Sequence, residues 1–318
     1  MVRSIACSAT LALVLSGCAG GPPPDVDHTP IAPTAVRETH TVNRGSDHFA
    51  AFESVTRTYS RRDMQRVESR VADSVAPLPE ADEPGVRIER ADRKLAWILD
   101  AGQKLYARCP LNGCRGAQSK KAAAPSARAG CRLRIGNTAF TIEPTGRKRS
   151  INGFDTEQYD IRWRVTFRDN ASRVATSTVS IDLWATPAAA APDDAVALEK
   201  AYARARAAAL GRNPEAGEAS YLPPEAGHMI ERFLAPNISP DDRAAFLAGA
   251  RQLDKVPGRP ILTNVQWQFS GAACALDRTL AGSVDKPLFA LSSEVKVQRI
   301  ENLHDSLFAP PPEYKQKK

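Results

Sequence analysis

Residues 159–168 constrain the fold of this chain more than any other segment. Apolar and polar side chains alternate there without exception, and the apolar set is Tyr159, Ile161, Trp163, Val165 and Phe167. A β-strand places successive side chains on opposite faces of its sheet, so one face of this strand is wholly apolar and the other wholly polar. The segment therefore predicts an antiparallel sheet that packs one face on a core and turns the other to water.

Further segments predict strands of the same kind. Three short runs within residues 86–108 are separated by turns that contain Asp or Gly, which is typical of an antiparallel meander. Residues 131–142 predict a hairpin around Gly136 and Asn137, because two strand-like runs flank this pair. The remaining expected strands are residues 49–59, residues 64–71, the run through Val179, Ile181 and Leu183, residues 261–269 and residues 289–300. Residues 64–71 also fit a helix, because Met64, Val67 and Val71 have the spacing of a helical stripe.

A helical segment is expected at residues 193–254, between two groups of strands. The run from Asp193 to Gly211 is rich in Ala, Leu, Glu, Lys and Arg, which favour helix. A second helix is expected at residues 224–234, and a third begins after Ser239 as its N-cap. Strands, helices and strands again predict one α+β domain whose helices cover one side of a large antiparallel sheet.

The first 17 residues have the features of a signal peptide. A basic residue near the start precedes a short apolar run, and this run is too short to span a bilayer as a permanent helix. The sequence from Leu15 to Cys18 resembles the lipobox of bacterial lipoproteins, in which the cysteine is acylated and becomes the first residue. The alternative is an ordinary secretory signal cleaved near Ala19, with Cys18 incidental.

Acylation of Cys18 by chains such as palmitate would attach the mature protein to a membrane, because two or more chains anchor stably. Ala19 follows the cysteine, whereas Asp there resembles the signal that retains lipoproteins in the inner membrane. We therefore expect a protein of the bacterial cell envelope, anchored in the outer membrane and facing the periplasm. Residues 18–46 are rich in Pro and poor in large apolar side chains, which predicts a flexible tether before a domain at residues 47–318.

Four cysteines follow the tether, at Cys109, Cys114, Cys131 and Cys274. In an oxidising compartment this even number predicts two disulfides. The preferred pairing joins Cys109 to Cys114 or to Cys131, with Cys274 linking the C-terminal part to the front of the domain. A zinc site is not expected, because no second close pair of Cys or His residues completes a tetrahedron. Residues 115–130 are small and basic and predict an exposed insert loop.

Composition and motifs argue against several classes of function. The formal net charge is +7, but basic and acidic residues are interleaved, which is typical of a solvated surface. Nucleic acid is not an expected partner, because no basic stripe with stacking aromatic residues is present. The chain has no Gly-x-Ser-x-Gly and no His-Glu-x-x-His, and His228 is interpreted as a surface residue. We expect no enzymatic activity and no cofactor.

Five motifs resemble, in order, those of a bacterial lipoprotein family of uncharacterised function. They lie at residues 88–106, with Arg90, Asp92, Trp97 and Tyr106, and at residues 150–159, 182–187, 255–260 and 305–315. The fold of that family is similar to that of the lipoprotein carrier and receptor proteins LolA and LolB. The resemblance implies a curved antiparallel half-barrel whose concave side is covered by helices. It supplies no catalytic residues.

In the better-known relatives the concave side receives the acyl chains of a lipoprotein. The expected lining of such a hydrophobic cavity here is Trp163, Phe167, Trp267 and Phe269. The alternative is that these side chains form a filled core under the helices. The corresponding functions are binding of a lipid or acylated ligand, and a structural or assembly role that docks an outer-membrane or cell-wall partner. The sequence does not identify a protein partner.

Overall fold

The structure of the protein is a computed structural model. It describes residues 27–74, 85–113, 131–187, 194–213, 222–234, 251–275 and 286–317, together with positions 238, 239, 241, 242, 245, 246 and 249. The strands are β1 (Ile31–Asn43), β2 (Phe52–Ser60), β3 (Met64–Ser74), β4 (Gly85–Arg90), β5 (Leu95–Asp100), β6 (Leu105–Pro110), β7 (Arg134–Ile151), β8 (Phe154–Arg168), β9 (Val174–Ala185), β10 (Pro260–Gly271), β11 (Phe289–His304) and β12 (Lys315–Gln316). The helices are α1 (Asp194–Ala209) and α2 (Pro224–Leu234), with 3-10 turns η1 (Arg251–Lys255), η2 (Ala273–Ala275) and η3 (Asp305–Phe308).

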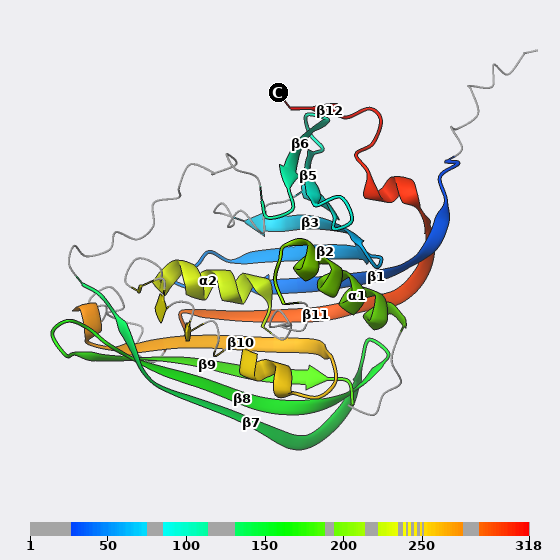
Figure 1. The fold of residues 1–318 in the computed structure, drawn as a ribbon. Coiled ribbons are helices and arrows are strands. Elements are labelled where there is room, and N and C mark those ends of the chain that lie inside the picture. The colour runs from blue at the N-terminus through cyan, green and yellow to red at the C-terminus, as the bar shows by residue number, and fades with distance from the viewer. Residues whose placement is uncertain are drawn as a thin grey trace, which may run out of the picture.

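All twelve strands form one curved, open sheet, in the order β12-β6-β5-β4-β3-β2-β1-β11-β10-β9-β8-β7 (Figure 1). Neighbours pair antiparallel except β12, which runs parallel to β6. Strand β11, late in the chain, lies beside β1, the first described strand, so segments far apart in the sequence pair in the middle of the sheet. This pairing joins the two antiparallel halves, β2–β6 and β7–β10, into a single layer.

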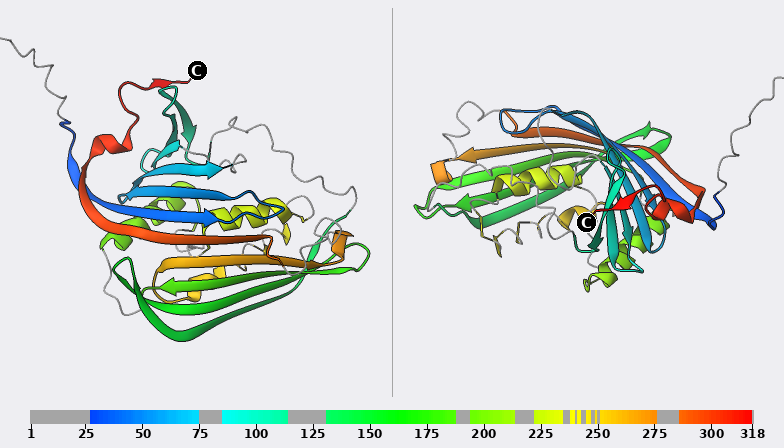
Figure 2. Two further views of the ribbon diagram at one scale, coloured as in Figure 1. Left: turned by 180° about the vertical axis from the view of Figure 1, so that it is seen from behind. Right: turned by 90° about the horizontal axis from the view of Figure 1, so that it is seen from above.

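The expected large antiparallel sheet with helices on its concave side is confirmed, but the α+β class needs correction. The described chain is mostly β, with only α1 and α2 as full α-helices, and it forms a curved open sheet. Both helices lie on the same side of that sheet when it is viewed from above (Figure 2). In the expected helical segment 193–254, positions 241, 242, 245, 246 and 249 are also helical.

The expected tether at residues 18–46 is wrong in its second half. Strand β1 pairs with β11 from Ile31 and with β2 from Ala35, so the sheet begins well before residue 47. The strand has few large apolar side chains. It is held in the sheet by backbone pairing on both sides and by small buried residues such as Thr34 and Ala35. Pro33 is tolerated because it lies where only β11 pairs with β1.

The expected hairpin at residues 131–142 is also wrong. Residues 134–151 form one long edge strand, and the register with β8 shifts between Ile135 and Thr138. The hydroxyl of Thr166 fixes this bulge, because it accepts the Asn137 N–H at 2.8 Å and donates to the Asn137 carbonyl at 3.1 Å. A Cβ at Gly136 would approach that hydroxyl to 2.9 Å. The Gly-Asn pair therefore encodes a β-bulge here and not a turn.

Helix α1 is held against the sheet by a buried carboxylate. Glu89 on β4 is 5% exposed and accepts hydrogen bonds from the Tyr202 hydroxyl and, at 2.8 Å, from Arg206 Nε. Arg87 forms a further ion pair with Glu89. Burial, and then the Glu89 charge, raises the pKa of the Tyr202 phenol, so Tyr202 stays protonated and donates. These contacts fix α1 across the strands of the first half of the sheet.

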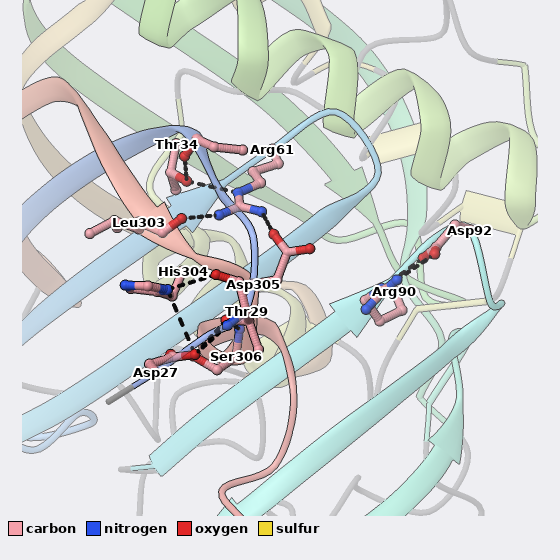
Figure 3. A network of polar contacts seen from close by, with 11 residues as sticks. Asp27, Thr29, Thr34, Arg61, Arg90, Asp92, Leu303, His304, Asp305 and Ser306 are labelled. Carbon is pink, nitrogen blue, oxygen red and sulfur yellow. Dashed lines mark hydrogen bonds and ion pairs between the residues drawn. The ribbon is translucent and has the colours of Figure 1, made fainter. Parts of the chain in front are cut away.

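A polar network fixes the point where the described chain begins (Figure 3). Arg61 is 7% exposed and donates to the Thr34 hydroxyl at 2.8 Å and to the Leu303 carbonyl at 2.6 Å. It also pairs with Asp305, and its guanidinium lies 4.8 Å from the centre of the Phe308 ring. Hydrogen bonds from Ser306, and then from Thr29, lower the pKa of Asp27 to about 2. Residues 27–30 are therefore tied to η3 at one end of β1 and β11.

Replacing Gly258 by Ala is expected to destabilise the turn before β10 by about 2–3 kcal/mol. Gly258 has φ +84°, and a Cβ there would lie 1.7 Å from the Thr186 carbonyl oxygen, so the backbone must move. Gly146→Ala is the matched control, because Gly146 has φ +76° with nothing within 4 Å, and it should cost about 1 kcal/mol. Urea unfolding checks both, and equal losses would show that contact with Thr186 is unimportant.

Candidate functional site

The four aromatic residues expected to line a cavity lie together on the concave face of the second half of the sheet. Trp163 and Phe167 are on β8, and Trp267 and Phe269 are on β10, with β9 between them. All four are at most 4% exposed and belong to one apolar cluster. The alternation that predicted their common face is confirmed, and their burial means that any ligand must displace what covers them.

Rings from other segments cover these four side chains. Phe246, from the third helical segment, lies 4.3 Å from Trp163 and 6.2 Å from Phe167 between ring centres. Phe233, from α2, meets Trp267 edge-on at 5.0 Å and lies 5.7 Å from Phe269. Helix α2 presents its apolar stripe to the same cluster, with Ala226, Met229, Ile230 and Leu234 buried. The concave face is thus a layer of aromatic rings under helical cover.

The third helical segment begins as its sequence predicts. Ser239 Oγ accepts the backbone N–H of Asp242 at 3.0 Å and donates to the Asp242 carboxylate at 2.7 Å, which is an N-terminal capping arrangement. The segment then lies directly on Trp163. A Cβ at Gly249 would lie only 3.1 Å from Trp163 Nε1 and Cζ2, so the missing side chain permits this approach.

The two buried indoles differ in one respect. Trp267 Nε1 donates to the hydroxyl of Ser177 at 2.8 Å, so its polar atom is satisfied. Trp163 is only 1% exposed, and its Nε1 is buried with no hydrogen-bond partner among the described residues. A buried donor without an acceptor costs free energy, so Trp163 carries an unsatisfied group into an apolar cluster.

The expected disulfides are clarified by the structure. Cys131 is bonded to Cys274, so the pairing of Cys109 with Cys131 is excluded and Cys274 links the C-terminal part to residue 131. Cys109, on β6, is also disulfide-bonded, and Cys114 lies outside the described residues. Cys131, Cys274 and Asp169 come within 4.8 Å of one another, but cysteines joined in a disulfide offer no thiolate to a metal.

Asp169 organises the turn between β8 and β9 beside this disulfide. Its fully buried carboxylate accepts the backbone N–H groups of Cys274, Ala171 and Arg173 at 2.8–2.9 Å and Arg173 Nε at 2.8 Å. Burial opposes ionisation, but the hydrogen bonds from Cys274 and Arg173 outweigh it and lower the pKa of Asp169 to about 2. The carboxylate therefore joins the end of β10 to the β8–β9 turn.

The pKa of Asp169 predicts how stability depends on pH. Its folded-state pKa of about 2 lies below the ordinary value of 3.8, so the unfolded chain binds the proton more tightly. The resulting stability is present above about pH 4 and is lost as the pH falls towards about 2. Asp169→Asn should therefore destabilise the protein at pH 6 and flatten its stability between pH 4 and 2. Urea midpoints measured across this range, with Asp100→Asn as an exposed control, check the prediction.

Other sequence expectations fall outside this cluster or outside the described chain. Cys18 and the expected insert loop at residues 115–130 are not among the described residues. His228 lies on α2 and does have an interaction partner. The role of Phe233 and Gly249 was not anticipated, although the apolar spacing of Phe233 with Met229 and Ile230 could have indicated an inward-facing stripe.

No helix within the described residues is both long and apolar enough to cross a membrane.

Comparisons with known proteins give one match. No protein-family model matches the chain, and a search of curated proteins finds no match. A search of solved structures matches a LolA superfamily protein from Nitrosomonas europaea, with 7% sequence identity, a TM-score of 0.25, and coverage of 89% of this chain and 91% of that chain. At this identity the match assigns no role to any residue of this chain.

Proposed function

We propose that the protein is a lipid-anchored, non-enzymatic lipoprotein of the bacterial envelope that binds an acyl chain between its concave sheet face and the helical cover. The observation that carries this proposal is the layer of aromatic rings on β8 and β10, covered by Phe233 and Phe246. An acyl chain has no hydrogen-bonding groups along its length, so it prefers a surface of this kind to water.

Separate segments supply the sheet and its cover. The sheet face is built by long paired strands, and Phe233 and Phe246 come from short helical elements of a single connection between β9 and β10. None of the twelve described strands lies in this connection, so movement of its helical elements would expose the rings and leave those strands paired. It would break the bridge between Ile238 and Leu133 and the hydrogen bond from the Ile135 N–H to Asp242. An acyl chain would replace the contacts that Phe233 and Phe246 make with the rings below them.

The beginning of the described chain limits how far an acylated Cys18 would lie from the sheet. Residues 27–30 are fixed beside η3, and eight residues lie between Cys18 and Asp27. A chain of that length reaches at most about 30 Å. An acylated Cys18 would thus keep the η3 end of the sheet close to the membrane. The linker between Cys18 and the sheet is shorter than the expected tether, which extended to residue 46.

Binding is tested with the full chain carrying Cys18→Ser, so that no acyl chain of its own is present. Native mass spectrometry and lipid extraction report co-purified lipid, and a fluorescent fatty acyl probe reports uptake. Phe233→Ala should speed dissociation of the probe, because it removes a covering ring from Trp267. The matched control is Phe308→Ala, a buried ring in a separate cluster of the sheet, which should leave dissociation unchanged. Absence of both lipid and uptake would refute the proposal.

The complete burial of all four rings favours a second candidate function. A filled core with no exchangeable cover would suit a structural lipoprotein that docks an outer-membrane or cell-wall partner. Chemical cross-linking in the envelope that captures one defined partner, together with failure of probe uptake, would favour this alternative.

A further inference from the structure

We propose that the indole N–H of Trp163 is the hydrogen-bond donor that recognises an acyl carbonyl oxygen at the concave face. This inference rests on the proposed function and adds to it the polar group of the ligand and the residue that contacts it. Among the described residues of the aromatic layer, Trp163 carries the buried donor that has no partner.

The comparison of the two indoles is the first step. Trp163 and Trp267 lie on the same face of the same sheet, and both are at most 1% exposed. Trp267 donates to Ser177, a polar residue on β9 that is itself buried and is well placed to satisfy the indole. No described residue accepts a hydrogen bond from Trp163 Nε1, so the buried N–H carries a cost in free energy in this state. A ligand oxygen at Nε1 would remove that cost.

The surroundings of Trp163 show where a ligand would arrive. Strand β8 is paired on both sides, with β7 and β9, so the indole is held on a rigid support. Its other neighbours are Phe246, at 4.3 Å between ring centres, and Gly249, whose position faces Nε1. Both belong to the cover and not to the sheet. A ligand oxygen at Nε1 would therefore take the place of Phe246 and Gly249, while the strand that carries Trp163 stays paired.

The chemistry of the site selects the ligand group. An indole N–H only donates, so it needs an acceptor, and an acyl carbonyl is an acceptor attached to an apolar chain. Phe167 lies beside Phe246, and Phe269 lies 5.9 Å from Phe167, so rings continue away from Trp163 along the sheet face. The chain would lie on these rings with its carbonyl at Nε1. A neutral ester fits such surroundings better than a carboxylate, because burial of an unpaired charge is costly.

The test compares ligands of equal chain length that differ in the ester group. The full chain with Cys18→Ser is titrated with methyl laurate and with tetradecane, which match in chain length, by competition against a fluorescent fatty acyl probe. Trp163→Phe should weaken binding of methyl laurate about two- to tenfold, as expected for one hydrogen bond, and leave binding of tetradecane unchanged. Trp267→Phe is the matched control, because its N–H is already used by Ser177, and it should not change the preference for ester over alkane.

A second measurement uses the protein without any substitution in the aromatic layer, so it does not depend on whether Trp163→Phe folds. The chain has four tryptophans, and NMR of the ¹⁵N-labelled protein reports each indole N–H. Methyl laurate should move the Trp163 resonance downfield, and tetradecane should not. Lauric acid distinguishes an esterified acyl chain from a free fatty acid as the ligand. If Trp163→Phe weakens binding of methyl laurate, the ligand is an esterified acyl chain, and if it weakens binding of lauric acid, the ligand is a free fatty acid. Either result supports the inference.

The outcomes separate this inference from the proposed function. The role of Trp163 is overturned if Trp163→Phe changes binding of ester and alkane equally, or not at all, and the Trp163 resonance shows no ester-specific shift. The proposed function is then left standing. Failure of every ligand to bind the protein overturns the proposed function itself.

Discussion

Replacing Cys131 and Cys274 together by alanine is expected to lower the free energy of unfolding by about 4–5 kcal/mol. The bond joins residues 143 apart in the sequence, so its loss frees a very long loop in the unfolded chain. In the folded protein it holds the segment before β7 to the segment after β10, across the end of β8 and β9. Urea unfolding of the oxidised protein and of the variant measures the difference.

The single variants provide the control for this result. Cys131→Ala and Cys274→Ala each remove the same cross-link, so each should lose nearly as much stability as the double variant. A double variant that loses less than about 1 kcal/mol would show that the unfolded chain is not restricted by this link. Non-reducing peptide mapping of the wild-type protein should find residues 131 and 274 in one cross-linked peptide pair.

Replacing Trp267 by alanine is expected to cost about 3–5 kcal/mol. Trp267 is fully buried and contacts Phe49, Phe233, Phe269 and Phe289, so truncation leaves a large cavity at the centre of the ring layer. It also removes the partner of the buried Ser177 hydroxyl. Urea unfolding followed by far-ultraviolet circular dichroism measures the loss without relying on tryptophan fluorescence.

Two substitutions calibrate this value. Ile98→Ala, at a strand position that is 39% exposed, should cost about 1 kcal/mol or less. Trp267→Phe should fall between the two, because it keeps most of the ring contacts but leaves Ser177 without its donor. A loss for Trp267→Ala no larger than that for Ile98→Ala would mean that the ring layer is loosely packed, and would weaken the case for a filled core.

Sequence alternation located most of the sheet because it reports a local property. Strand β8 shows it most clearly: the expected inward set, including Trp163 and Phe167, is buried, and Asp160, Arg162 and Arg164 are exposed. The cap at Ser239 was predictable for a similar reason, since its partner Asp242 is three residues away. Interactions within a few residues leave a pattern that can be read without the fold.

Features that depend on distant partners were missed or left open. Strand β1 has few large apolar residues, and its place beside β11 depends on a segment about 260 residues later in the chain. The Gly136–Asn137 pair looked like a turn, but Thr166 on the next strand makes it a bulge. The choice of Cys274 as the partner of Cys131 likewise depends on the sheet bringing two strand ends together.

By itself, the sequence determined which side chains of each long strand share a face, where the capped third helical segment begins, and that the four aromatic residues of β8 and β10 point the same way. Only the tertiary structure decided that β1 and β11 join two half-sheets and that Phe233 and Phe246 cover the rings. It also decided that, among the described residues, Trp267 has a hydrogen-bond acceptor and Trp163 has none. The physical reason is range: side-chain alternation follows from backbone geometry within one strand, whereas a hydrogen bond between strands or a ring under a helix exists only after distant segments have packed.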